Sequence, residues 1–488
     1  MFRLILTAAL ALQVPVCLAA PVMADAGHTL AARVQLLADT SPTATNVTTS
    51  DTPMPIAQPP AGDNERLPFD VNSPDESPVG NNERLPLNLV NNFAGTDTIN
   101  AYVTGLNSEN HVVFLQSNGE WHYPTTTTTT SDSTASNEPQ LVTADVAIPV
   151  GNGNSAGGNS SSTANRITPL TLPGYLSGGR IWFVRGNLDF FTVAGKDGIT
   201  LVEPSVVNPS DSSVNVEWDF VELTTDAADG VTADISFVDF VGLPLGITLE
   251  GINSNESQSI QGLTDSLEDI CDELRQQACA DGQPWDQLCV TTNSTTDSRT
   301  LRILSPTDYL VQNPNAFDGY FEGYVGQVWQ YYASHTLVTD GGVSCSVTGS
   351  ELTCDGDNRG YARPTTTDIF GCNTGPFEIA ASDNDIHKAV VPWLCASFNR
   401  HTLLANETRS ASRNSTQPAS GNSTQPASGN SLGYFTQSPN NWYSSIIHRH
   451  EAGGKGYAFS YDDVPVNGVD LSGLVQSPNP ATLTVTIG

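Results

Sequence analysis

The chain has 488 residues, of which 19 are Lys or Arg and 52 are Asp or Glu, so its formal net charge is −33. Binding to nucleic acid depends on basic patches that neutralise phosphates, and this composition argues against such a partner. An acidic surface keeps a protein soluble and suits neutral or cationic partners, among which a neutral polysaccharide is compatible.

The N-terminus has the pattern of a secretory signal peptide. Arg3 precedes an apolar run from Leu4 to Ala20, and small residues lie at Ala19, Ala20 and Ala24. A charged start, a short apolar core and a small-residue cleavage site predict a signal over residues 1–24. No later stretch is long and apolar enough for a membrane span. We therefore expect a secreted protein, extracellular or in a cell wall, without membrane contact.

Sequons and cysteines both fit an exported chain. Seven asparagines head N-x-[ST] sequons: Asn46, Asn159, Asn255, Asn293, Asn406, Asn414 and Asn422. Cys17 lies in the signal, and seven cysteines follow it: Cys271, Cys279, Cys289, Cys345, Cys354, Cys372 and Cys395. We expect a local bridge from Cys345 to Cys354, a second from Cys372 to Cys395, and one free thiol. The cysteine spacings contain no C-x-x-C, so a zinc site is not expected. We expect no other metal and no cofactor.

Composition then divides the chain. Residues 25–84 are rich in Pro, Thr and Asn and predict a disordered segment, because they cannot bury enough apolar surface to offset chain entropy. From Leu85 to about Leu249, short β-branched and aromatic runs between Gly, Asn and Asp predict strands. Polar stretches near residues 125–165 and 406–432 predict disordered insertions.

Helical periodicity begins after the strands. Apolar residues at helical spacing run from Leu263 to Leu274, and a second helix is predicted from Phe317 to His335 with Asn315 as N-cap. A third is predicted near 387–398. The pattern predicts a mainly β protein with an α/β second lobe, a cleft between the lobes, and a monomer.

One predicted strand carries a carboxyl on an apolar face. Alternation places Glu222 on the same side as Val216, Trp218, Phe220 and Thr224. Such surroundings disfavour the charged form of a carboxyl, which suits a general acid.

The next predicted strand carries a second carboxyl. Asp239 shares a face with Ile235, Phe237 and Val241, and a turn-rich stretch from Thr225 to Val231 predicts a hairpin between the two strands. Glycoside hydrolysis needs two carboxyl groups, one to protonate the leaving oxygen and one to activate water or attack the sugar. On pattern alone, the alternative that both acids bind loop amides is the stronger one.

These residues lie within segments that resemble a known family. The main segments are Leu201–Val206, Asn215–Thr224 and Phe237–Pro244. Supporting segments are Leu85–Asn92, Asn100–Gly105, Ser177–Phe183, Phe398–Leu404 and Gly456–Val464. Together they resemble glycoside hydrolase family 64, the β-1,3-glucanases with a thaumatin-like fold, and its fungal members in particular. The resemblance covers about residues 85–488, which is most of the mature chain.

The resemblance implies an endo-acting, inverting β-1,3-glucanase that releases laminarioligosaccharides from a wide groove. It implies Glu222 as general acid and Asp239 as general base, with Thr224 and Asp226 holding the sugar. Asp226 stands where the family has an amide side chain, and Leu223 replaces an aromatic residue. An aromatic residue expected near Val231 is also missing.

Further residues are candidates for the site. Glu203, in a Val-Glu-Pro stretch, and Asp463, beside Asp462, are expected to bond sugar hydroxyls, although strand-end acids also cap turns. Trp442 is a candidate stacking platform, with burial as its alternative. His448 and His450, two residues apart on a strand-like run, lack a third metal ligand and favour a surface or core role.

Two rival functions remain open from the sequence. The first is a non-catalytic module that binds glucan on the same scaffold, since fold does not dictate activity. The second is a structural cell-wall glycoprotein, suggested by the Thr- and Ser-rich segments and the sequons.

Overall fold

The structure is a computed structural model that describes residues 83–93, 98–125, 139–151, 166–195, 198–253, 256–292, 299–404, 433–466 and 470–488. The predicted signal, almost all of the segment 25–84, the insertion near 406–432 and all seven sequon asparagines lie outside these ranges. Within the other predicted insertion, residues 140–141 and 148–150 form strands β5 (Gln140–Leu141) and β6 (Ile148–Val150).

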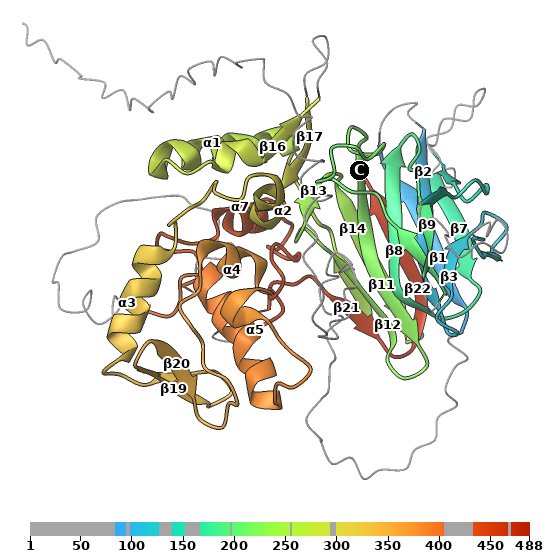
Figure 1. Cartoon of the computed structure of the whole chain (residues 1–488). Coiled ribbons are helices and arrows are strands. Elements are labelled where there is room, and N and C mark those ends of the chain that lie inside the picture. The colour runs from blue at the N-terminus through green and yellow to red at the C-terminus, as the bar shows by residue number, and fades with distance from the viewer. Residues whose placement is uncertain are drawn as a thin grey trace, which may run out of the picture. The chain divides into compact units, whose positions relative to one another are not determined.

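Strands from the first half of the chain, together with two strands from its C-terminal end, form two layered sheets, as predicted for a mainly β protein (Figure 1). One sheet has five strands in the order β15 (Ser257–Ile260), β14 (Leu245–Gly251), β22 (Pro480–Ile487), β1 (Leu85–Asn91) and β7 (Ile167–Leu172). Strands β1 and β22 run parallel, so the first and last strands of the described chain lie side by side.

The second sheet has eight strands. Its main order is β21 (Val475–Ser477), β12 (Gly230–Ile235), β11 (Trp218–Asp226), β8 (Leu176–Arg185), β2 (Ile99–Asn107), β3 (Val112–Leu115) and β4 (Trp121–His122), with β6 beside β2. Alternation on β11 turns Val221 and Leu223 toward a hydrophobic core shared with the five-stranded sheet.

The opposite face of the eight-stranded sheet carries an aromatic cluster, which we define as Tyr102, Phe114, Trp182, Phe190, Trp218, Phe220 and Phe240. Trp182 is central, with ring centroids 5.0 Å from Phe220 and 5.5 Å from Trp218. Aromatic pairs of this kind stabilise by about 0.5–1.5 kcal/mol each beyond burial. The cluster packs side chains of β2, β8 and β11 together on the face where the predicted acid Glu222 lies.

A small sheet lies near this cluster and brings in a residue from elsewhere in the chain. Strand β10 (Gly198–Val202) pairs with β9 (Phe191–Gly195), which pairs with β5. Glu203 follows β10 directly. Glu203 therefore belongs to a different sheet from Glu222.

The described residues between 263 and 466 form the helical region. Its helices are α1 (Leu267–Asp281), α2 (Pro306–Gln312), α3 (Glu322–Tyr332), α4 (Thr366–Gly371), α5 (Asp385–Asn399) and α7 (Trp442–His450). Two short sheets join them, in the orders β13 (Phe240–Val241), β17 (Thr300–Leu304), β16 (Cys289–Thr291), and β18 (Leu337–Val338), β19 (Ser344–Thr348), β20 (Glu351–Cys354). Single turns of 3₁₀-helix occur at Trp285–Leu288 and Gly375–Phe377. No helix among the described residues is long and apolar enough to cross a bilayer.

The three predicted helices exist with shifted ends. Ser266 caps α1, and its side chain and that of Asp269 form a reciprocal capping box, so the helix begins after Leu263. Helix α3 begins at Glu322 rather than Phe317, because residues 317–321 form turns that bury Phe317 and Phe321. Helix α5 agrees with the predicted range to within two residues.

The prediction of a strand-like run around His448 and His450 is wrong, because these residues end helix α7. The run contains β-branched and aromatic residues, which resemble a strand locally, but Asn441 caps a helix there by accepting from the Ser444 amide. His448 contacts Glu451 and Asp462, while His450 contacts Asp265 and Glu273. Both histidines thus have structural carboxylate partners.

Both predicted disulfides, Cys345–Cys354 and Cys372–Cys395, are present. A third joins Cys271 in α1 to Cys289 at the start of β16. The prediction of one free thiol is wrong for the described cysteines, because Cys279 is disulfide-bonded as well.

Candidate active site

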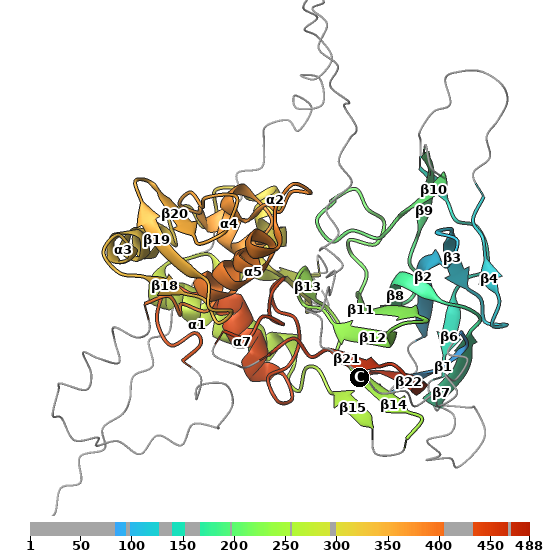
Figure 2. The same ribbon diagram turned by 90° about the horizontal axis from the view of Figure 1, so that it is seen from below.

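A polar row crosses three neighbouring strands of the eight-stranded sheet. In the strand register, Glu222 of β11 lies opposite Arg180 of β8 on one side and opposite Asp234 of β12 on the other. These strands are adjacent in Figure 2. Arg180 and Glu222 are each two residues from a member of the aromatic cluster, Trp182 and Phe220, so the row continues the same outer face.

Arg180 is the hub of this row. Its Nε and Nη2 donate to Oε1 of Glu222 at 3.1 and 3.0 Å, and its Nη1 donates to Oε2 of Glu203. The guanidinium carbon also lies 4.7 Å from the ring centroid of Phe220 and 5.6 Å from that of Trp182. Two ring faces and two carboxylates therefore fix the position of this cation.

The two carboxylates remain reachable from solvent while the cation between them is mostly covered. The side chains are 14% exposed for Arg180, 27% for Glu222 and 30% for Glu203. A partly desolvated ion cluster with open carboxylates is a common arrangement at sites of acid–base chemistry.

Asp239 reaches the row because the sheet breaks after Ile235. Strand β12 ends there, and Ser236 forms an isolated bridge with Tyr457. The predicted strand from Ile235 to Val241 is therefore wrong. Had the β11–β12 register continued, Asp239 would have paired with Glu217 and faced the side of the sheet opposite to Glu222.

The break is held by three hydrogen bonds from the helical region. The hydroxyl of Tyr443 in α7 donates to the carbonyl of Phe237 at 2.7 Å, and the Phe237 amide donates to the carbonyl of Tyr457 at 2.6 Å. The amide of Ser305, the N-cap of α2, donates to the carbonyl of Asp239 at 2.8 Å. These contacts place the Asp239 segment by backbone atoms and leave its carboxyl available.

Asp219 ties this segment to the strand that carries Glu222. One of its oxygens accepts from the amides of Gly242 and Leu243 at 2.8 and 3.0 Å, and the other accepts from Phe220 at 2.8 Å. Burial raises the pKa of Asp219 to about 7, although these three amides favour its charged form. Asp219 thereby fixes the chain just after Asp239 relative to β11.

Burial raises the pKa of Asp239, a shift that the charge of Arg180 opposes and that of Glu222 reinforces. Burial likewise raises the pKa of Glu203, opposed by Arg180 and reinforced by Glu222. Glu203, Glu222 and Asp239 thus lie within electrostatic range of one another and of Arg180. The site can hold a protonated carboxyl beside a carboxylate, which acid–base hydrolysis requires.

Two further carboxyls that the sequence reading missed complete the cluster. Burial and the charges of Glu222 and Asp463 raise the pKa of Asp234 well above its usual value. Burial and the charge of Asp239 raise the pKa of Asp308, in the first turn of α2, to about 8. Each of the two predicted catalytic acids therefore has a neighbouring carboxyl whose pKa is raised.

Strand alternation contained a signal for one of these missed residues. Val231, Ala233 and Ile235 face the core, so Asp234 had to face the other side. The hairpin register then places it opposite Glu222. Asp308 gave no comparable signal, because it reaches the site through the docking of α2.

Thr224 and Asp226 lie on the same strand as Glu222. Thr224 shares its face, and the Thr224 Oγ1 accepts from the Gly178 amide at 3.3 Å. Asp226 caps the following turn, where its Oδ1 accepts from the amides of Ala228 at 2.7 Å and Asp229 at 2.6 Å.

Trp442 and Asp463 lie in the helical region. Trp442 is partly buried against the core, with its indole nitrogen covered, which matches the burial alternative. Asp463 is an exposed residue near Asp234. Desolvation by the surrounding chain, together with the charges of Asp470 and Asp462, raises the pKa of Asp463 to about 6.

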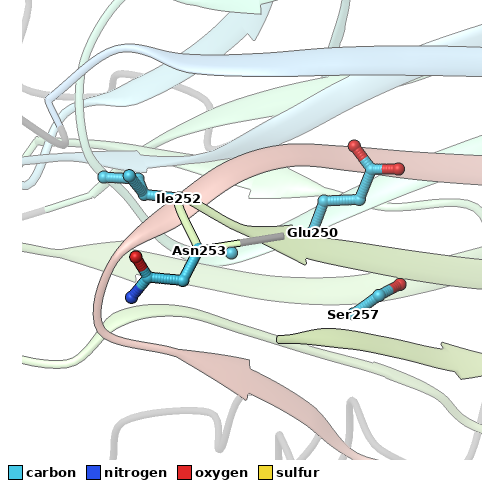
Figure 3. A pocket seen from close by; sticks show the side chains of 5 residues that line it. Glu250, Ile252, Asn253 and Ser257 are labelled. Atoms are coloured by element: carbon cyan, nitrogen blue, oxygen red, sulfur yellow. The ribbon is translucent and has the colours of Figure 1, made fainter. Parts of the chain in front are cut away.

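A pocket at the end of β14 is separate from these acids. It is lined by Glu250, Gly251, Ile252, Asn253 and Ser257, and its side chains are shown in Figure 3. None of the predicted site residues lines it. Among the described residues, no group of three His, Cys, Asp or Glu side chains is arranged to hold a metal ion.

The sequence model of the β-1,3-glucanase family, glycoside hydrolase family 64, matches residues 83–487. A glucan endo-1,3-β-glucosidase of Cellulosimicrobium cellulans is 24% identical over 313 residues, which are 62% of this chain and 50% of that protein. A second enzyme of that name, from Arthrobacter sp. (strain YCWD3), has the same identity and coverage. The chain thus spans about half the length of the curated relatives it matches.

Solved structures share this fold. A laminaripentaose-producing β-1,3-glucanase in complex with laminaritetraose aligns with a TM-score of 0.65 at 24% identity, over 83% of this chain and 98% of that one. A β-1,3-glucanase domain from Clostridium beijerinckii aligns with a TM-score of 0.59 at 21% identity, with the same coverage. Since the family match extends over nearly all of the described residues, the chain belongs to glycoside hydrolase family 64, the β-1,3-glucanases.

Proposed function

We propose that this protein is a glycoside hydrolase that cuts β-1,3-glucan internally and releases laminarioligosaccharides. The observation that carries the proposal is that Glu222 and Asp239 both lie near Arg180. Glu222 comes from strand β11, and Asp239 comes from the segment after the end of the neighbouring strand β12. Family membership and the names of the related enzymes support the substrate class.

In the proposed reaction, Glu222 gives its proton to the glycosidic oxygen as the bond to the anomeric carbon breaks. Asp239 takes a proton from a water molecule, whose oxygen attacks that carbon from the opposite face. The configuration is therefore inverted. An inverting pair needs about 6.5–9.5 Å between its carboxyl groups to admit the water.

The electrostatics of the free protein do not assign the two roles. Glu222 accepts two hydrogen bonds from Arg180, whereas burial raises the pKa of Asp239. The assignment of Glu222 as acid and Asp239 as base rests on the family resemblance. Variants that separate proton donation from water activation test this assignment directly.

We propose that the outer face beside the polar row forms the sugar-binding groove. Among the candidate residues, Thr224 is the best placed to contact sugar, because it lies two residues after Glu222 on the same face of β11. Asp226 lies at the end of the strand, and Asp463 lies in the helical region near Asp234. Glu203 and Trp442 have protein partners that compete with sugar contacts.

The proposal extends to the biology of the chain. We propose a secreted, monomeric enzyme that is located in a cell wall or in the medium and has a thaumatin-like fold. A fungal source is proposed from the sequence resemblance alone. The related proteins named above are bacterial.

Incubation of the purified chain with linear β-1,3-glucan tests the activity. We expect short oligosaccharides to appear early while the mean polymer length falls, as an internal cut requires. Release of glucose alone from chain ends would overturn endo action. Binding to the insoluble polymer without new reducing ends would favour a non-catalytic glucan-binding module.

A further inference from the structure

Glu203 was expected to contact sugar, but its carboxylate accepts a hydrogen bond from Arg180. Each guanidinium nitrogen of Arg180 donates to a carboxylate, since Nε and Nη2 bind Glu222 and Nη1 binds Glu203. All three of these hydrogen bonds go to two protein carboxylates. Arg180 is therefore positioned to hold the side chains of Glu203 and Glu222.

The contact with Glu222 is one-sided. Both donors of Arg180 bind Oε1, and within the described part of the chain Oε2 of Glu222 makes no hydrogen bond. One oxygen is thus clamped while the other is left to meet the glycosidic oxygen. This is the geometry expected of a positioned proton donor.

The positive charge of Arg180 beside Glu222 opposes proton donation by Glu222, and the negative charge of Glu203 offsets it. A cation hydrogen-bonded to a carboxyl favours its charged form, which opposes proton delivery. Around Glu222 the charged and titratable groups are Arg180 on β8, Asp234 on β12, Glu203 after β10 and Asp239 before β13. Of these carboxyls, only Glu203 is hydrogen-bonded to Arg180 together with Glu222.

We propose that Glu203 is a positioning residue that acts through Arg180: it holds the guanidinium in place and offsets its charge, so that Glu222 can carry the proton for the leaving group. This role rests on the proposed function. It differs from sugar binding, because it requires Glu203 to act on Glu222 rather than on the substrate.

The chain offers a matched control for this pair. Glu217, one residue before β11, accepts from Arg185 of β8 at 2.8 Å and lies 3.2 Å from Arg299. It is a second Glu–Arg pair that involves an arginine of β8, and it does not contact the polar row. Glu217→Gln therefore removes an equivalent charge without touching Glu222.

The direct test is to titrate the Glu222 carboxyl by carbon NMR in protein labelled at glutamate, with the signal assigned by its loss in Glu222→Gln. In Glu203→Gln we expect the midpoint to move to lower pH by about one unit, equivalent to a tenfold change in proton affinity. In Glu217→Gln it should stay in place. An unchanged midpoint in Glu203→Gln overturns the proposal.

Kinetics supply the second readout. Glu203→Gln should lower kcat on glucan by roughly tenfold near neutral pH and move the alkaline limb of its pH profile by about one unit to the acid side. An activated aryl β-1,3-oligoglucoside, whose leaving group needs no proton, should be cut at nearly the parental rate. A rise in KM with an unchanged profile would instead assign Glu203 to sugar binding.

A double-mutant cycle checks that Arg180 is the intermediary. On an Arg180→Gln background, Glu203→Gln should add less than about a twofold change, because coupled residues are not additive. A full additional tenfold loss would contradict action through Arg180. If the parent protein cuts no β-1,3-glucan, the proposed function fails, while the titration of Glu222 still decides the role of Glu203.

Discussion

Two arginines in this molecule, Arg180 and Arg400, each contact aromatic rings and carboxylates, but their surroundings differ in solvent exposure and charge balance. Arg180, in the sandwich, lies over Phe220 and Trp182 and contacts carboxylates that solvent can reach. Arg400, in the helical region, lies 4.6 Å from the ring centroid of Tyr434 and 5.2 Å from that of Phe459.

The Arg400 centre is sealed and balanced. Arg400 pairs with Asp462 at 3.0 Å with both side chains fully buried, and Asp462 also binds His448, which contacts Glu451 at 2.8 Å. The two carboxylates raise the pKa of His448 to about 10, against the effect of its burial. Two cations therefore meet two anions.

The Arg180 centre is open and unbalanced. One cation faces Glu203, Glu222 and Asp239, with Asp234 next in the row. Carboxyls in excess over cations retain protons, and protons held near solvent can be transferred. The comparison indicates that charge balance, more than the presence of an ion pair, separates a structural centre from a reactive one.

The largest expected effect lies in the open centre. Glu222→Gln should lower kcat/KM on linear β-1,3-glucan by about 10²–10⁴-fold, the usual contribution of general acid catalysis. Its melting temperature should change little, because a partly exposed ion pair contributes at most about 1 kcal/mol. The activated aryl substrate should still be cut, since its leaving group departs unprotonated. Loss of both activities to the same extent would contradict the acid role.

Asp239→Asn should show the complementary behaviour. We expect loss on both substrates by a similar factor of about 10²–10⁴, because the attacking water loses its base. Azide should restore cleavage of the aryl substrate and give an inverted glycosyl azide, since this anion needs no deprotonation. If azide instead restores Glu222→Gln, the two roles are exchanged.

In the sealed centre the expected effect is on stability. Asp462→Asn leaves Arg400 and His448 without their buried partner and should lower the free energy of unfolding by about 3–5 kcal/mol. Denaturant unfolding followed by fluorescence measures this, with Glu217→Gln as a control that should change far less. A loss below about 1 kcal/mol would show that the two centres do not differ as described.

The pH dependence of stability sharpens the comparison further. Burial raises the pKa of several carboxyls: Glu203, Asp219, Asp234, Asp239, Asp308, Glu451 and Asp463. In the unfolded chain they titrate near about pH 4, so between that pH and about 8 the native state binds more protons and stability falls as pH rises.

The other shifted groups set the limits of this dependence. The stabilisation from His448 is complete below its unfolded pKa and is lost as pH rises through about 10. Glu273, whose pKa His450 lowers to about 2, stabilises above its unfolded pKa and loses this contribution as pH falls through 2. Melting temperatures should therefore be several degrees higher near pH 5 than at pH 8. A higher value at pH 8 would refute this ordering.

The sequence predicted the face of Glu222 correctly because β11 is a regular strand, where alternation alone decides direction. It also predicted that Asp239 lies near Glu222, but for an incorrect reason, namely a continuous strand from Ile235 to Val241. The sheet breaks after Ile235, and the contacts that hold the break come from Tyr443 and Tyr457, about 200 residues later in the chain. Local periodicity contains no information about such distant partners.

The same limit explains the other differences. Arg180 is an ordinary strand residue until the register places it beside Glu222, and Asp308 joins the site only through the docking of α2. The α7 run was misread because its β-branched and aromatic residues fit a strand as well as a helix. Propensity is a weak guide where tertiary contacts decide.

The most direct measurement is proton NMR of the anomeric signals during the first minutes of cleavage of linear β-1,3-glucan, before mutarotation. An acid and a base acting across a water molecule predict that new reducing ends appear first as the α-anomer, and that the Glu222→Gln and Asp239→Asn proteins give no comparable signal. New ends that appear first as the β-anomer, or an undiminished signal from either variant, would contradict the account.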